Sequence, residues 1–154
     1  AGTSREDAAA SEGSSSDDAD TLTIHAAPRF ADPDTLSQLG ALSSHELDAL
    51  PYGVIRLSNE GRVEFVNEAG LQLPGLKEAD DRTTLIGKNF FLDLAPSTKN
   101  NLFLGRFKQG LQKGAMDARF PYTFISPGRA PKVLTVHLYR KPHQDVNWLL
   151  FRPM

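Results

Sequence analysis

The sequence contains no cysteine, which excludes a disulfide framework, a zinc–thiolate site, a thiol nucleophile and a thioester-linked cofactor. It has no apolar run near the roughly 18 residues that a membrane span requires. Its start also lacks the basic and apolar regions of a signal peptide. A formal net charge of −2 without a basic stripe argues against nucleic acid and anionic membranes as partners. We therefore expect a cytoplasmic protein that binds neither nucleic acid nor a membrane.

Residue patterns typical of catalytic and metal sites are missing as well. The sequence has no Gly-rich phosphate loop and no carboxylates paired at catalytic spacing. Its histidines are scattered, with no pair at i, i+4; they are His25, His45, His137 and His143. Strand alternation places His137 on the face opposite Leu134 and Val136, which disfavours a haem ligand aimed into a cavity. We predict no metal site, no cofactor and no enzymatic activity.

The composition divides the chain into three segments. Residues 1–21 are mostly Ala, Gly, Ser and acidic residues, which predicts a disordered acidic tail. Residues 22–50 suit an N-terminal helical cap: a short extended piece and then two short helices. Asp34 is the expected cap of the first helix, and Ser43 with Glu46 forms a capping box for the second. Pro51 ends this pattern, and 51–154 are expected to form the domain body.

Within the domain body the spacing predicts two strands, a helical region and three further strands. The strands are expected at 53–57, 62–66, 118–125, 133–140 and 146–152. The longest helix follows Pro96, with Ser97 or Thr98 as its cap and Gly114 at its end. The predicted class is α+β, with a five-stranded antiparallel sheet and helices between strands two and three.

The last strand indicates a sheet that is buried on both faces. Trp148 and Leu150 alternate with Leu149 and Phe151, so apolar side chains point to both sides. The helix after Pro96 covers one face. The other face needs the leucine-bearing helices of 22–50 or a second subunit.

Several stretches resemble known proteins. Residues 65–69 (FVNEA) resemble a strand end common in PAS domains. Residues 47–55 (LDALPYGVI), 86–96 (IGKNFFLDLAP) and 122–124 (YTF) resemble the photoactive yellow protein family in particular. The resemblance covers about 47–151 and implies a PAS fold with a role in sensing.

The resemblance also implies a chromophore site, and this sequence departs from it. In that family the residue after the Ala-Pro pair is the cysteine that carries a p-coumaroyl thioester, and here it is Ser97. A tyrosine and a buried glutamic acid hold the phenolate, and their positions align with Val66 and Gly70, which have no side-chain donor. We therefore expect the fold and the site of the cavity without the photochemistry.

Two functional interpretations remain open. One is a sensor that binds a small apolar ligand in a cavity. The expected lining of this cavity comprises Ile55, Val66, Gly70, Phe90, Ser97 and Phe124. The other is a ligandless interaction module that contacts a protein partner or forms a homodimer. Its expected surface comprises Leu36, Leu39, Leu42, Leu149 and Phe151. The leucines of the N-terminal helices could instead cap the sheet of their own chain.

Overall fold

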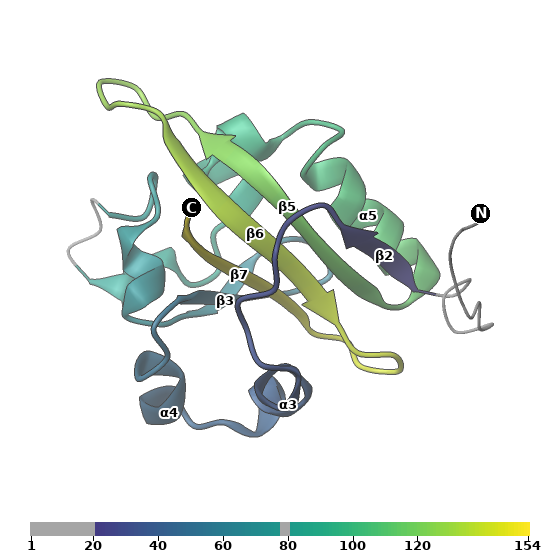
Figure 1. Cartoon of the computed structure of the whole chain (residues 1–154). Coiled ribbons are helices and arrows are strands. Elements are labelled where there is room, and N and C mark those ends of the chain that lie inside the picture. Colours follow the sequence, from purple (N-terminus) through teal and green to yellow (C-terminus); the bar gives the residue numbers. More distant parts are fainter. Residues whose placement is uncertain (1–20, 78–80) are drawn as a thin grey trace.

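The computed structural model describes residues 21–77 and 81–154, so the predicted acidic tail lies outside the described residues except for Thr21. The described strands form one sheet in the order β2-β5-β6-β7-β3-β4 (Figure 1). Their bounds are β2 Leu22–His25, β3 Gly53–Leu57, β4 Val63–Val66, β5 Met116–Phe124, β6 Lys132–Arg140 and β7 Asn147–Pro153. The two predicted strands before the helical region and the three after it are confirmed.

The sheet has a sixth strand that the sequence analysis assigned to the N-terminal cap. Strand β2 pairs in parallel with β5, whereas the other strand pairs are antiparallel. Leu22 and Ile24 pack against the main core, while Thr23 and His25 are exposed. Pairing with β2 satisfies backbone groups that β5 would otherwise leave open at the sheet edge. The prediction of a purely five-stranded antiparallel sheet is corrected in this respect.

Short helical turns connect β4 to β5. They are η2 Ala69–Gln72, η3 Arg82–Leu85, the π-helical turn η4 Phe90–Leu94, η5 Pro96–Thr98 and the longer helix α5 Leu104–Lys113. Helix α5 ends at Gly114, whose φ of 83° suits glycine, as expected. The predicted caps of this helix are wrong, because Ser97 and Thr98 belong to a separate turn and α5 begins six residues after Thr98 at Leu104.

The cap helices form as the sequence predicts. Helix α3 spans Pro33–Gln38, the turn η1 spans Leu39–Ala41 and helix α4 spans Ser44–Asp48. The capping box of Ser43 and Glu46 is present in both directions. The first helix is capped by Asp32, not by Asp34, because Pro33 occupies the first helical position.

Apolar side chains fill both faces of the sheet. The larger core lies under α5 and the η turns, and includes Phe90, Phe103, Phe107 and Leu149. The smaller core lies under the cap, where Leu36, Leu39 and Leu47 pack on Val54, Trp148 and Leu150 of the sheet. Figure 1 shows the segment after β2 crossing the front of β5 and β6 to reach α3, with α5 behind β5. The cap therefore covers the second face of its own sheet.

Candidate functional site

Four of the six predicted pocket residues lie together in the larger core. Ile55, Val66, Phe90 and Phe124 belong to one cluster, and none is more than 2% exposed. The ring of Phe103 belongs to the same cluster and packs on two of them, with its centroid 6.0 Å from those of Phe90 and Phe124. The pockets described below are lined by none of these four residues. Here the aromatic side chains pack on one another.

Ser97, the fifth predicted pocket residue, lies at the edge of this core. Its side chain is half-buried, and its carbonyl oxygen accepts hydrogen bonds from Tyr122 Oη at 2.5 Å and Asn100 Nδ2 at 3.0 Å. Asn100 Oδ1 accepts from Phe103 N at 2.9 Å, just before α5 begins. Thus Asn100, rather than Ser97, organises the entry to the helix.

Gly70, the sixth predicted pocket residue, sits where little space remains. A Cβ at this position would lie 2.9 Å from Val66 Cγ1 and 3.0 Å from Asn67 Oδ1. A longer side chain here requires Val66 or the Asn67 network to shift. Ser97 supplies no thiol, and Val66 and Gly70 supply no side-chain donor for a phenolate, so these residues do not fit a p-coumaroyl thioester.

The five predicted interaction residues do not form one surface. Leu36 and Leu39 belong to the cap and are buried against the sheet, and Leu42 packs beside them. Leu149 and Phe151 lie in the larger core on the opposite face, at 0% and 4% exposure. Successive strand residues point to opposite faces, so Trp148 and Leu150 are the sheet residues that meet the cap leucines. The grouping made from the sequence is corrected accordingly.

Asn67 joins the cap to the domain body. Its Nδ2 donates to the carbonyl oxygens of Leu47 at 2.7 Å and Tyr52 at 3.1 Å. Its Oδ1 accepts from the backbone N–H groups of Val54 and Gly70, both at 2.8 Å. The side chain is fully buried, and all its hydrogen-bonding groups are used. One residue therefore links α4, the segment after it, β3 and η2.

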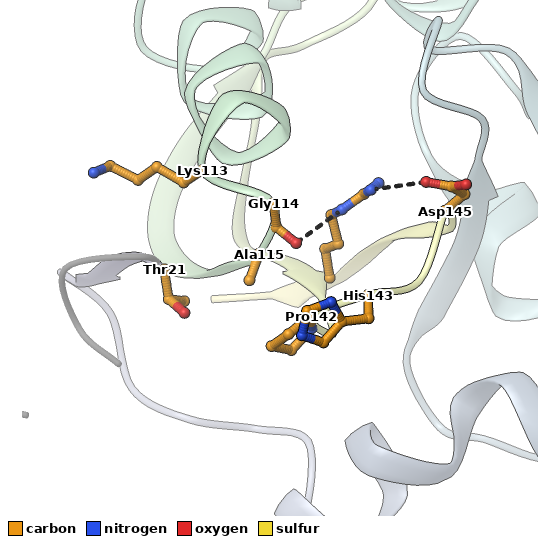
Figure 2. A pocket seen from close by; sticks show the side chains of 8 residues that line it. Thr21, Lys113, Gly114, Ala115, Pro142, His143 and Asp145 are labelled. Atoms are coloured by element: carbon orange, nitrogen blue, oxygen red, sulfur yellow. Dashed lines mark hydrogen bonds and ion pairs between the residues drawn. The ribbon is translucent and has the colours of Figure 1, made fainter. Parts of the chain in front are cut away.

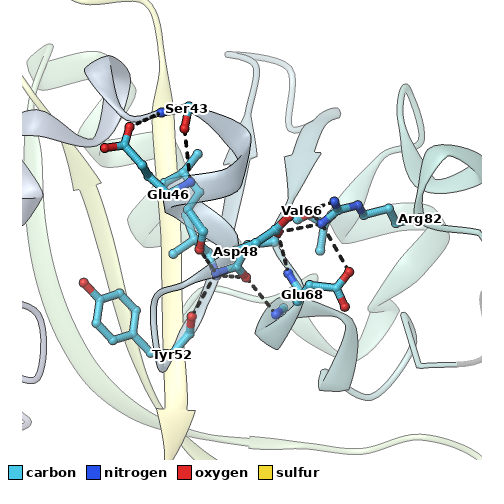
Figure 3. A network of polar contacts seen from close by, with 11 residues as sticks. Ser43, Glu46, Asp48, Tyr52, Val66, Glu68 and Arg82 are labelled. Carbon is cyan, nitrogen blue, oxygen red and sulfur yellow. Dashed lines mark hydrogen bonds and ion pairs between the residues drawn. The ribbon is translucent and has the colours of Figure 1, made fainter.

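An ion pair beside Asn67 makes a second link (Figure 3). Asp48, at the end of α4, binds Arg82 through Oδ1–Nη1 at 2.7 Å and Oδ2–Nη2 at 2.9 Å. Arg82 also donates to the carbonyl oxygen of Val66 at 3.1 Å, and Glu68 N donates to Asp48 Oδ1 at 2.9 Å. The hydrogen bonds from Arg82, and then that from Glu68 N, outweigh desolvation and lower the pKa of Asp48.

A buried histidine lies on the sheet face that the chain crosses before α3. His137 Nε2 is 2.6 Å from Asp117 Oδ1, and Phe30 meets the imidazole edge-to-face at 6.2 Å. This confirms that His137 points away from the larger core. Burial raises the pKa of Asp117, but the hydrogen bond with His137 and the electrostatic effects of His137, His25 and Arg119 together outweigh it, and the net shift is downward.

The largest of the described pockets lies at the C-terminal end of α5 (Figure 2). It measures about 850 Å³ and is lined by Thr21, Lys113, Gly114, Ala115, Arg140, Pro142, His143 and Asp145. The Arg140 guanidinium donates to Gly114 O, Asn147 Oδ1 and Asp145 Oδ1 at 2.9–3.2 Å. These bonds give Arg140 a structural role in holding the turn between β6 and β7.

A smaller pocket of about 240 Å³ lies where the cap joins the body. Its lining includes Pro51 and Tyr52 after α4, Ala69 and Gln72 of η2, and Phe151 of β7. The Phe151 ring sits over Gly53, whose added Cβ would lie 2.3 Å from the ring. A molecule in this pocket would touch Tyr52, which bonds to Asn67, and Ala69, which precedes the Asn67 partner Gly70.

The described residues include no group of three or more His, Asp or Glu side chains placed to hold a metal ion. Across 21–77 and 81–154, no helix is long and apolar enough to cross a membrane.

Comparison with known proteins identifies the family. No protein-family model matches the chain. It is 34% identical to the photoactive yellow protein of Halochromatium salexigens over 123 residues, covering 80% of this chain and 94% of that protein. This chain belongs to the photoactive yellow protein family.

Solved structures agree with this assignment. The photoactive yellow protein domain from the sensor histidine kinase Ppr of Rhodospirillum centenum is 30% identical, with a TM-score of 0.67. The match covers 75% of this chain and 97% of that domain. A PAS domain from a two-component sensor histidine kinase has a TM-score of 0.51 at 13% identity, covering 79% of this chain and 99% of that domain, which shows the fold alone. The predicted PAS fold and the family resemblance are confirmed, and the structural relatives are sensory domains.

Sequence reasoning missed the residues that join the cap to the body. Asn67 was noted as part of a PAS-like strand end, but nothing in the sequence showed that its side chain reaches Leu47. Asp48 and Arg82 are 34 positions apart, with no periodicity linking them. Their pairing depends on how the segment after β4 folds back.

Proposed function

We propose that this protein is a signalling module of the photoactive yellow protein family that works without a covalent chromophore. Its moving element is the N-terminal cap without strand β2, residues 26–50. The observation that carries the proposal is the Asn67 side chain, whose bonds join α4 to β3 and η2. Any change in η2 or in the segment after α4 alters these bonds, and with them the free energy of cap docking.

Release of the cap would uncover an apolar surface. Val54, Trp148 and Leu150 lie on the second sheet face beneath the cap leucines. An exposed apolar sheet face of this kind favours association with a second copy or a protein partner. The proposed output is therefore a change in association, which fits a sensory domain.

A small apolar ligand is the second candidate for the input. The pocket of about 240 Å³ between Pro51, Ala69 and Phe151 supports it, because it touches both η2 and the segment after α4. Its lining is mostly apolar, as ligand sites usually are. Without a ligand, the same module would respond only to a partner protein.

The cap can be followed through Trp148, the only tryptophan in the sequence. Its indole is buried under the cap at 3% exposure, so cap release will shift its fluorescence to longer wavelength. We would compare the Asn67→Ala variant with Asn101→Ala, which changes an exposed asparagine before α5. Hydrogen exchange at Leu36, Leu39 and Leu47 would be recorded alongside.

For Asn67→Ala we expect red-shifted emission, faster exchange in the cap and a larger dimer fraction in native mass spectrometry. Exchange in β5 and β6 should stay close to that of the parent protein, as should all readings for Asn101→Ala. If the cap and the core lose protection together, the cap is not an independent element and the proposal fails. A released cap with unchanged association would overturn the proposed output.

A further inference from the structure

A long groove runs along the exposed side of α5, on the face of the molecule opposite the cap. It consists of two adjoining pockets of about 290 Å³ and 200 Å³, which share Lys99, Leu104 and Lys108. The first is also lined by Asn59, Glu60, Asn89, Phe91, Leu92, Phe107 and Leu111. The second adds Asn100, Asn101 and Gly105. One half of the groove is thus mainly apolar and the other is polar.

The apolar half has a rigid floor and exposed walls. Phe91 and Phe107 are buried, with ring centroids 5.1 Å apart. Leu104 and Leu111 are half-buried, and they lie with Phe107 at i, i+3 and i+7 on one face of α5. Leu92 is 53% exposed at the edge. A partner can therefore bury apolar surface here without unpacking the core.

The positive and negative side chains lie in different parts of the groove. Lys99 and Lys108 lie where the two halves meet, and both are exposed. Among the residues that the structure describes, neither lysine forms an ion pair with a carboxylate. Glu60 lines only the apolar half. An occupant with carboxylates beside the lysines and apolar side chains toward Phe91 matches this arrangement.

We propose that this groove docks an acidic peptide segment from a partner protein, with two leucine-sized side chains in its apolar half. The extent of the two joined pockets suits a segment better than a compact ligand, which usually buries most of its own surface. The acidic segment of this chain, residues 1–20, does not match the groove, because it contains no large apolar side chain to occupy the apolar half.

The test uses two synthetic 14-residue peptides with blocked ends. Both carry leucines at positions spaced i, i+4, with glutamates flanking the leucines in one peptide and lysines in the other. Binding is measured by isotope-edited NMR and fluorescence anisotropy on the full chain. The glutamate peptide should saturate, moving the amide signals of Leu104, Phe107 and Lys108, and the lysine peptide should bind at least tenfold more weakly.

Two variants test the charged and the apolar parts of the groove separately. The double variant Lys99→Glu/Lys108→Glu and the single variant Leu92→Asp change exposed side chains, so the fold is retained. Each should weaken binding of the glutamate peptide at least tenfold. The control Lys132→Glu changes a lysine at the separate pocket of about 240 Å³ and should leave this binding unchanged. Absence of saturable binding, equal binding by the double variant, or signals that move on the cap face would overturn the proposal. Trp148 emission is read in the same samples, so failure here is distinguishable from failure of cap signalling.

Discussion

Asp48 and Arg82 form a two-pronged ion pair that fastens the last turn of the cap helix α4 to the turn η3, with contacts of 2.7 and 2.9 Å. The side chains are 21% and 30% exposed, so solvent screens the pair only in part. Arg82 also holds the carbonyl oxygen of Val66, at the end of β4. The pair therefore couples the end of β4 and the turn η3 directly to the cap.

Removing the guanidinium should loosen the cap. We expect Arg82→Ala to lower the free energy of unfolding by roughly 1–2 kcal/mol, since it removes charge-assisted hydrogen bonds from a partly exposed site. Arg82→Lys should be intermediate, because an ammonium cannot reproduce the planar fork. Urea unfolding followed through Trp148 measures both. The exposed Lys88→Ala is the control, and an equal loss there would contradict the assignment.

Acid should release the same contact. The pKa of Asp48 is lowered in the folded protein, mainly by the hydrogen bonds from Arg82. Its contribution to stability is present above the unfolded value of about 3.8 and is lost as pH falls through the lower folded value. Stability measured from pH 6 to pH 3 should fall less steeply for Asp48→Asn than for the parent protein. A slope remains, because the pKa values of Glu46 and Asp117 are also lowered.

The sequence predicts the body of this fold well, because each element there carries a local signal. The strand-forming residues of 53–57 and 133–140 and the Ser43–Glu46 capping box are such signals, and the structure forms β3, β6 and the capping box there. Strand β2 was harder to predict, since four residues paired in parallel depend on an edge that β5 provides much later in the chain. Long-range pairing of this kind leaves little trace in local periodicity.

The candidate site could be predicted only in part. Burial of Ile55, Val66 and Phe90 follows from the apolar pattern, but whether their core holds a cavity depends on how Phe103 packs. The Asp48–Arg82 ion pair is harder still to predict, because the sequence indicates only a charged surface residue at position 82. Only the three-dimensional fold brings it beside Asp48.

Gly53 should resist substitution. The Phe151 ring lies 2.3–2.7 Å from the place where a Cβ would be added, and both residues sit in paired central strands. We expect Gly53→Ala to destabilise the protein by about 1–3 kcal/mol through overpacking. Gly40→Ala is the matched control, because a Cβ added there would have no atom within 4 Å beyond its chain neighbours and its own helical turn, which accepts alanine. Thermal unfolding of the two variants with similar melting temperatures would contradict this account.

The buried imidazole should depend on its carboxylate. Asp117→Ala removes the partner of His137 Nε2 inside a site with 0% imidazole exposure. An unsatisfied buried donor costs about 1–3 kcal/mol, and we expect that loss at pH 7. Thr123→Ala, an exposed change on the same strand and the same face, should cost far less. Chemical unfolding of both variants measures the difference, and equal midpoints would show that the pair is energetically neutral.

Restoring a thiol alone should not restore a yellow photoreceptor. In Ser97→Cys the new side chain would be half-buried, as Ser97 is, so activated p-coumaric acid can be offered to it. Val66 and Gly70 supply no side-chain donor, and the Phe103 cluster fills the neighbouring core, so nothing stabilises a buried phenolate. We expect no visible absorption band after treatment, whatever intact-mass measurement shows for attachment. The untreated variant and treated parent protein are the controls. A stable visible band in Ser97→Cys would mean that the core opens to accept the chromophore and finds donors that Val66 and Gly70 do not provide.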